Sequence, residues 1–368
     1  MKQRNILAAG FALMLVALSL ISCKKNPEQP LIDALDQTFS SAFPQDGPGA
    51  AVLITRGGKV LLDKGYGLAD MDTKAKIDGD TFFNIASMSK QFTAVAILQL
   101  AQEGKLSVDD CIHKYFPEFK ADFWDRITIA NLMSHTSGVP DARGYIPYEE
   151  KILATDSLSM AYLYNLDTLN FQPGEQYEYI NPTYVVLGKI VERVSGEEFE
   201  AYMRSHIFDP AQMKSTVYYV PGLDARIPNM SHGYELGDQD SLWHECDYGE
   251  ETFFATRPDG GIYTSTHEFL SWEKALHNGT VLDKEYLELA QTPKILVSEN
   301  PVRQYGYGWI VEHRDNAPVN VYHTGANGGF RTLGAYYPAS DVEVIIFSNR
   351  VDFNWAVFKP VVEELMGI

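Results

Sequence analysis

Runs with the pattern of β-strands lie near both ends of this chain, and runs with the pattern of helices lie between them. Residues 50–55 and 60–62 are β-prone and flank Gly57-Gly58, which predicts an early hairpin. Four later runs also look extended, at residues 306–311, 319–323, 332–337 and 342–347. If the early and late strands share one sheet, the chain has an α/β (α+β) fold with an inserted helical region.

The length of 368 residues is long for a single hydrophobic core. It fits either two subdomains or one domain with a large insertion. We expect the folded unit at residues 31–368, with a sheet part at about 31–105 and 255–368. An all-helical part would then cover about 106–254.

The N-terminus has the composition of an export signal. Lys2 and Arg4 precede an almost wholly apolar run at residues 6–21, which is short for a full membrane span. The run ends in Leu20-Ile21-Ser22-Cys23, which resembles the end of a bacterial lipoprotein signal. The alternatives are a signal peptide with an incidental cysteine and an uncleaved anchor helix.

The lipoprotein resemblance implies a particular processing of this N-terminus. Residues 1–22 would be the signal peptide, and Cys23 would be the lipidated first residue of the mature chain. The polar residues 23–30, which include two prolines, would form a tether. We therefore expect an exported bacterial lipoprotein, anchored to a membrane in the periplasm or cell envelope.

The charge of the chain narrows the choice of partners. Its 49 acidic residues against 30 Lys and Arg give a net charge of −19. Such a field repels nucleic acid and anionic lipid surfaces, so we expect no nucleic-acid partner. The sequence has no nucleotide motif and no Cys/His spacing typical of zinc, so we expect no cofactor and no metal.

The strongest helical pattern, at residues 81–104, contains a serine and a lysine three positions apart, Ser87 and Lys90. Residues at this spacing share one face of a helix, so the hydroxyl and the amine can meet. A desolvated lysine can take the proton from a serine and make it a nucleophile. The alternative is a helix-capping serine followed by a solvated lysine. Ser89 is a weaker candidate because adjacent helical positions do not face each other.

Further short motifs accompany this pair in the order typical of one family. The chain resembles the serine β-lactamase and penicillin-binding protein superfamily, in its class C-like branch. The matching segments are Pro48-Gly49-Ala50, Ser87-Met88-Ser89-Lys90, Ser134-His135-Thr136-Ser137-Gly138, Pro173-Gly174-Glu175, Tyr179-Ile180-Asn181, Gly306-Tyr307-Gly308-Trp309 and His323-Thr324-Gly325. The resemblance implies a β-lactamase/transpeptidase-like fold, with an antiparallel sheet flanked by helices.

The resemblance also implies roles for individual residues. Ser87 would be the acylated nucleophile, and Lys90 its general base or proton shuttle. Tyr179, as a phenolate or as a tyrosine hydrogen-bonded to Lys90, would relay the proton to the leaving group. Asn181 would hold the substrate amide or Lys90. Tyr177 is an alternative to Tyr179, but only Tyr179 has an asparagine two residues later.

The third motif, His323-Thr324-Gly325, would lie on a strand beside the serine. The N–H groups of Ala326 and Ser87 would form the oxyanion hole. Many relatives have lysine at the first position, where its charge attracts a substrate carboxylate. A neutral histidine attracts a carboxylate only weakly, so His323 favours an esterase or peptidase over an antibiotic-degrading enzyme.

Together the motifs imply a serine hydrolase that acts on an ester or amide through an acyl-enzyme. The substrate would be a small molecule or a peptide. One alternative is a DD-carboxypeptidase or a β-lactamase proper. Another is a non-catalytic penicillin-binding or sensor lipoprotein that keeps the fold. We interpret His135-Thr136-Ser137-Gly138 as a structural turn, because no base partner is evident in the sequence.

Overall fold

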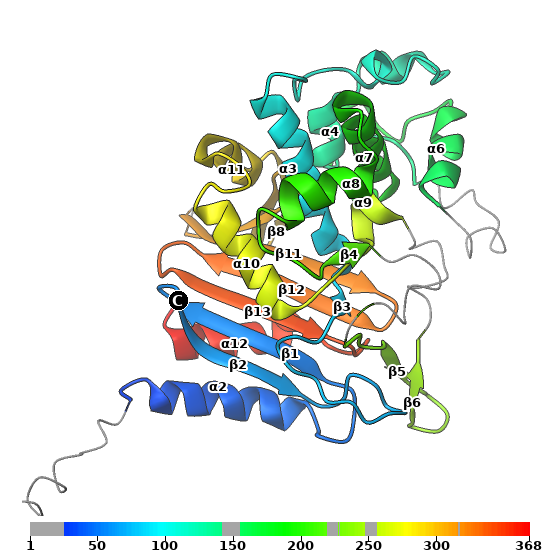
Figure 1. Cartoon of the computed structure of the whole chain (residues 1–368). Helices are drawn as coiled ribbons and strands as arrows, with labels where there is room; N and C mark the ends of the chain where they lie inside the picture. The colour runs from blue at the N-terminus through cyan, green and yellow to red at the C-terminus, as the bar shows by residue number, and fades with distance from the viewer. Residues whose placement is uncertain (1–25, 142–154, 219–226, 228, 247–255, 316) are drawn as a thin grey trace, which may run out of the picture.

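An eight-stranded antiparallel sheet organises the computed structural model of this protein (Figure 1). The structure describes residues 26–141, 155–218, 227, 229–246, 256–315 and 317–368. The strand order is β2-β1-β13-β12-β11-β10-β9-β8. The strands are β1 (Ala50–Arg56), β2 (Lys59–Tyr66), β8 (Ile295–Glu299), β9 (Val302–Tyr305), β10 (Ile310–Arg314), β11 (Ala317–Asn327), β12 (Phe330–Tyr337) and β13 (Val342–Ser348).

The two ends of the chain meet inside this sheet, as the sequence predicts. β1 pairs with β13 over its whole length, from Ala50 opposite Ser348 to Arg56 opposite Val342. Both strands are almost fully buried, because helices cover both faces of the sheet here. β8 and β9 were not predicted, because their residues are mostly half-exposed and show no clear apolar alternation.

Two helices cover one face of the sheet, α2 (Gln29–Ala42) and α12 (Trp355–Met366). α2 lies below the sheet in Figure 1, α12 is partly hidden behind the strands, and the rings of Phe39 and Phe358 stack between the two helices at 5.6 Å. α2 begins at Gln29, so the last two residues of the expected tether belong to this helix. Pro30 explains the start, because proline suits the first turn of a helix.

The opposite face carries the larger core and the helical part. Its helices are α3 (Ser89–Gln102), α4 (Ile129–Met133), α6 (Asp156–Tyr164), α7 (Pro182–Ser195), α8 (Phe199–Met203), α9 (Arg257–Gly260), α10 (Thr266–His277) and α11 (Lys284–Gln291). The expectation of an all-helical region at 106–254 is wrong in detail. β4 (Val217–Tyr218), β5 (Tyr234–Leu236) and β6 (Trp243–Glu245) lie within it, each too short to leave a period in the sequence.

The helix expected at residues 81–104 is shorter at its start. β3 (Phe83–Asn84) comes first and pairs with β7 (Ile262–Thr264), which commits the backbone to an extended conformation. Ala86 then has a left-handed φ of 47°, which no α-helix accepts. Ala86 opens a 3₁₀ turn, Ala86–Met88, and α3 begins only at Ser89.

The expected signal peptide 1–22 and the lipidation residue Cys23 lie outside the described residues, so both stay predictions from the sequence. Among the helices that the structure describes, none has the length and apolar character required to cross a bilayer.

Candidate active site

A strained turn presents Ser87 at the beginning of α3. Ala86, directly before it, is buried in the left-handed region, which costs a residue with a Cβ about 1 kcal/mol. The N–H of Ala86 donates to Asn84 Oδ1 at 2.7 Å, and the N–H of Ile85 donates to the Ile262 carbonyl at 3.0 Å. These bonds hold the turn so that Ser87 is partly exposed while the residues on either side of it are buried.

Lys90 lies one turn later and reaches back to Ser87, as the i, i+3 spacing predicts. Its Nζ is 3.1 Å from Ser87 Oγ and donates to the Asp259 carbonyl at 2.8 Å. The side chain is completely buried, with the amine 4.9 Å from the centre of the Tyr179 ring and 5.6 Å from that of Tyr184. This geometry excludes the alternative of a solvated lysine.

Tyr179 completes a group of three side chains around Ser87. Its hydroxyl is buried and has no hydrogen bond of regular geometry in the described part of the chain. Burial raises the pKa of Tyr179 well above its usual value, although an interaction with Ser87 lowers it in part. Tyr179 is therefore a neutral phenol at neutral pH, so of the two forms expected for the relay the protonated tyrosine is favoured over the phenolate.

His135 holds the backbone on both sides of Tyr179, a role that the sequence analysis did not assign. Its carbonyl accepts the N–H of Glu178 at 3.0 Å, and its Nδ1 accepts the N–H of Ile180 at 3.2 Å. Its ring also packs against the Tyr179 ring, with centroids 4.2 Å apart. Because Nδ1 accepts, the neutral ring carries its proton on Nε2. The motif His135-Thr136-Ser137-Gly138 was the sequence signal for this role. It was interpreted as a structural turn, and no contact between His135 and the Tyr179 segment was predicted.

His323 lies on β11 as a buried, neutral imidazole. Nδ1 is 2.7 Å from the Thr324 carbonyl, which can only accept, so Nδ1 carries the proton. Nε2 then accepts from the Tyr305 hydroxyl at 2.9 Å. Burial and the charge of Lys90 lower the pKa of His323 to about 3. Tyr305, another residue without an assigned role in the sequence analysis, thus helps to keep this histidine uncharged.

A neutral His323 predicts a loss of stability in mild acid. The unfolded chain takes up a proton near pH 6.5, whereas the folded chain resists it until about pH 3. Stability is therefore complete above about pH 6.5 and falls between these values, by about 3 kcal/mol at pH 4. In His323→Gln this part of the loss should be absent. Urea unfolding at pH 7 and pH 4 measures it, and an equal fall in both proteins would contradict the assignment.

Gly325 permits the close approach between β11 and the serine turn. A Cβ at this position would lie 2.2 Å from the Ile85 carbonyl oxygen and 2.2 Å from Thr332 Oγ1, so only glycine fits. Thr332 Oγ1 donates to that same carbonyl at 3.1 Å. Thr324 and Ala326 are exposed beside Gly325. The Ala326 N–H therefore lies on the strand next to the turn, and its place in the oxyanion hole stays a prediction.

Asn181 stands at the start of α7, two residues after Tyr179. It is half-buried, and its side chain does not cap the helix. The expected contact of Asn181 with the substrate amide or with Lys90 stays a prediction.

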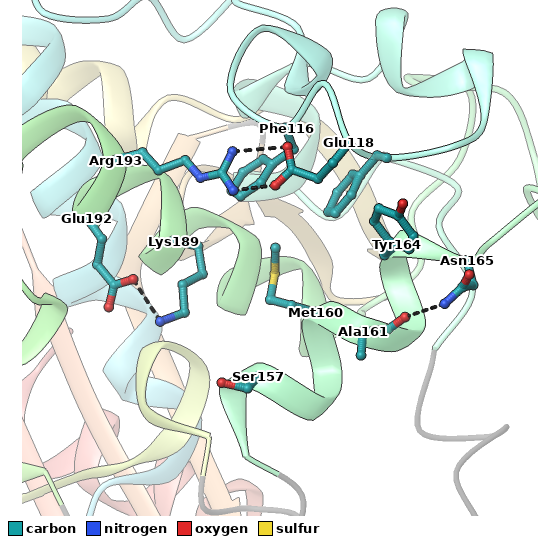
Figure 2. Close-up of a pocket in the computed structure, with 11 residues that line it drawn as sticks. Phe116, Glu118, Ser157, Met160, Ala161, Tyr164, Asn165, Lys189, Glu192 and Arg193 are labelled. Atoms are coloured by element: carbon teal, nitrogen blue, oxygen red, sulfur yellow. Dashed lines mark hydrogen bonds and ion pairs between the residues drawn. The ribbon is translucent and has the colours of Figure 1, made fainter.

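A separate hollow of about 560 Å³ lies in the helical part and contains none of the expected site residues (Figure 2). Its charged groups pair with one another. Lys189 contacts Glu192 at 2.7 Å, and Arg193 binds Glu118 and covers the Phe116 ring at 4.0 Å. Because its cations are already paired with carboxylates, this hollow is a poor candidate for acyl-transfer chemistry.

Comparison with known proteins identifies the family. A family model described as beta-lactamase matches residues 35–359. The chain belongs to the beta-lactamase family. Protein flp of Staphylococcus aureus (strain MW2) is 31% identical over 309 residues, which cover 82% of this chain. Penicillin-binding protein 4* of Bacillus subtilis (strain 168) is 28% identical over 328 residues, 86% of this chain and 72% of that protein. The chain spans only 59% of the length of flp.

Solved structures confirm the beta-lactamase fold. A penicillin-binding protein from Bacillus halodurans superposes with a TM-score of 0.75 and 25% identity, covering 90% of this chain and 98% of that one. A D-amino acid amidase from Ochrobactrum anthropi SV3 gives 0.74 at 21% identity, covering 92% of this chain and 99% of that one. The latter likeness establishes the fold alone. The roles of the individual site residues stay predictions within this beta-lactamase family member.

Proposed function

We propose that this protein is a serine hydrolase that forms an acyl-enzyme on Ser87. The contact between the fully buried Lys90 amine and Ser87 Oγ, at 3.1 Å, carries the proposal. Burying an amine costs free energy unless it has hydrogen-bonding partners. The position of Lys90 is therefore explained by its contact with Ser87 and not by an interaction with solvent. Membership of a family of hydrolases supports the same reaction type.

The proposed reaction has two stages. Ser87 Oγ attacks the acyl carbonyl, and its proton passes to Lys90 in its neutral form. Tyr179, a neutral phenol, gives a proton to the leaving group and takes one back through Lys90. The N–H groups of Ser87 and Ala326 stabilise the oxyanion. Water then adds to the acyl-enzyme, releasing the acid and restoring the Ser87 hydroxyl.

The environment of His323 favours acyl donors without a carboxylate next to the scissile bond. With its pKa near 3, His323 offers no positive charge at neutral pH. Arg331 donates to the carbonyls of Gly328 at 3.0 Å and Phe330 at 2.7 Å, within its own turn. We therefore favour neutral esters and amides over β-lactams and peptides with a C-terminal D-alanine.

Two measurements distinguish the proposed hydrolase from the alternative functions: a comparison of substrates and the labelling of Ser87 by a probe. Turnover of a neutral ester or amide well above that of a D-alanyl-D-alanine peptide and a cephalosporin supports the proposal. Faster turnover of the peptide or the cephalosporin favours a DD-carboxypeptidase or β-lactamase. Failure of a fluorophosphonate or fluorescent penicillin to label Ser87 favours a non-catalytic binding or sensor protein.

Removal of the Tyr179 hydroxyl tests the relay. Tyr179→Phe keeps the ring that contacts His135 and Lys90, so the fold should be unchanged. The buried hydroxyl has no regular hydrogen bond to lose, so stability should not fall. We expect kcat/KM for an ester to fall by about 10²–10⁴-fold. Tyr177→Phe is the matched control, and a larger loss in that variant would transfer the role to Tyr177.

A further inference from the structure

Two acidic residues occupy core positions that face each other between α10 and the sheet. On β13, Glu343 shares the face of Ile345 and Phe347, which belong to the apolar core beneath α10. On α10, Glu273 lies one turn after the buried Phe269, whose ring packs on Phe347 at 5.6 Å. Both positions lie on the apolar face of their element, where apolar residues are expected.

These carboxyl groups are buried without matching partners among the described residues. Glu273 is 6% exposed and Glu343 is 5% exposed. The Oε1 atom of Glu343 is fully enclosed and accepts no hydrogen bond there. Lys274 is the cation that favours ionisation of Glu343, but it is exposed, and Asp341 opposes its effect. An unpaired buried carboxylate costs several kcal/mol, so this arrangement needs a compensating group.

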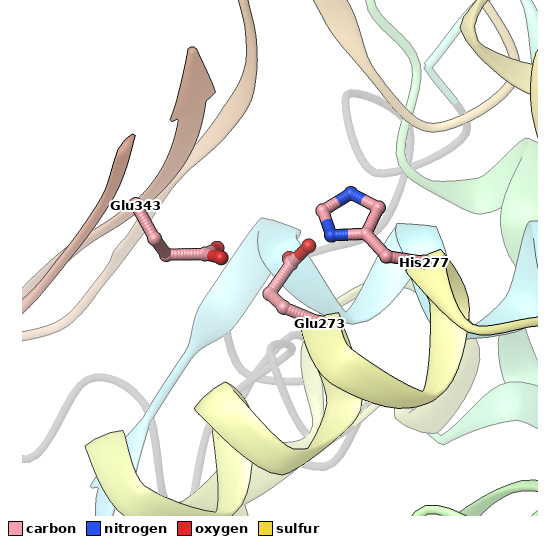
Figure 3. Close-up of side chains that lie close together, drawn as sticks. All are labelled: Glu273, His277 and Glu343. Carbon is pink, nitrogen blue, oxygen red and sulfur yellow. The ribbon is translucent and has the colours of Figure 1, made fainter. Parts of the chain in front are cut away.

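A histidine completes the group. His277 follows Glu273 by four residues and therefore lies on the same face of α10. Donor atoms of Glu273, His277 and Glu343 all lie within 4.8 Å of one another. Figure 3 shows the Glu343 carboxylate extending from β13 toward the Glu273 carboxylate, with the His277 imidazole beside it at the end of α10. The His277 ring also packs against Tyr336, with centroids 4.2 Å apart.

We propose that Glu273, His277 and Glu343 bind one Zn²⁺ ion that fastens the end of α10 to β13. One imidazole and two carboxylates form a common zinc ligand set, and a water molecule can occupy the fourth position. Side-chain shifts of up to about 1 Å would bring the three donors to about 2.1 Å from one ion. His277 is exposed and provides the path of entry. The ion would be structural, because no residue of the Ser87 group belongs to the set.

The proposal also accounts for the electrostatics of the pair. Burial raises the pKa of both carboxyl groups, that of Glu273 to about 8. A divalent cation would offset this penalty by neutralising both carboxylates at once. A proton shared between the two glutamates is the competing explanation.

Calorimetric titration of the full chain with Zn²⁺, after removal of metals by a chelator, tests the proposal. We expect one tight site in the parent protein and at least about 100-fold weaker binding in Glu343→Gln. His244→Gln is the matched control, because that histidine is exposed and paired with Asp240 at 2.9 Å. It should bind Zn²⁺ like the parent. Ester hydrolysis by Glu343→Gln at the parent rate would show that this variant is folded.

A second variant protects the test against a folding defect. His277→Ala changes an exposed residue and should also lose the tight site while keeping its circular dichroism spectrum. Absence of a tight Zn²⁺ site in the parent protein would overturn the proposal. Binding of Zn²⁺ by Glu343→Gln and His277→Ala as tightly as by the parent would overturn it too. If Glu343→Gln is also as stable as the parent at pH 7, the two carboxyl groups share a proton instead.

Discussion

Replacement of Ser87 with alanine should abolish hydrolysis of a chromogenic ester, reducing kcat/KM by about 10⁴-fold or more. The hydroxyl is the atom that forms the acyl-enzyme, and no other side chain can supply it at this position. The fold should be unaffected, because Ser87 is partly exposed and alanine has the same backbone preferences here. Initial rates together with a circular dichroism melting curve provide the measurement.

Ser89 provides the matched control for this substitution. It is buried two residues later, and its Oγ accepts the N–H of Ile262 at 3.2 Å. Ser89→Ala should therefore cost about 1–3 kcal/mol of stability, through the unsatisfied N–H, and leave kcat/KM within a few-fold of the parent. Full activity in Ser87→Ala, or a complete loss only in Ser89→Ala, would remove Ser87 from the mechanism.

Replacement of Lys90 with methionine should have the second largest effect. Methionine fills nearly the same volume between the rings of Tyr179 and Tyr184, so packing is kept. The Asp259 carbonyl loses a donor at 2.8 Å, which costs about 1–3 kcal/mol. Loss of the base should lower the rate of acylation by about 10³-fold or more. Single-turnover kinetics with an ester separate this step from deacylation.

A double variant distinguishes a shared role from two independent ones. If Lys90 acts only through Ser87, then Lys90→Met combined with Ser87→Ala should be no less active than Ser87→Ala alone. Lys105→Met is the control, because this lysine is exposed and pairs with Glu103 at 2.7 Å, away from the Ser87 group. Retention of more than a tenth of the acylation rate in Lys90→Met would exclude Lys90 as the base.

The sequence was informative where chemistry depends on neighbouring positions. Ser87 and Lys90 are three residues apart, and the predicted contact is present at 3.1 Å. The predicted start of their helix was wrong, because the pairing of β3 with β7 depends on residues far away in the chain. The left-handed Ala86 left no sign in the sequence, since alanine is otherwise a strong helix former.

Groups assembled from distant segments could not be predicted in the same way. His135 holds Glu178 and Ile180 only because the fold brings two loops together. The burial of Glu273 and Glu343 depends on the packing of α10 against β13, and the neighbouring residues in the sequence do not indicate it. In both cases the decisive property is burial, and local periodicity does not report the burial of a single polar residue.

The intact mass of the protein after brief exposure to a panel of acyl donors tests the central proposal most directly. An ester or amide donor should add the mass of one acyl group, and peptide mapping should place it on Ser87. The adduct should disappear as water resolves the acyl-enzyme, and it should not form in Ser87→Ala. A stable adduct on another residue, or hydrolysis with no acyl-enzyme even after rapid quenching, would contradict the assignment of Ser87 as the nucleophile.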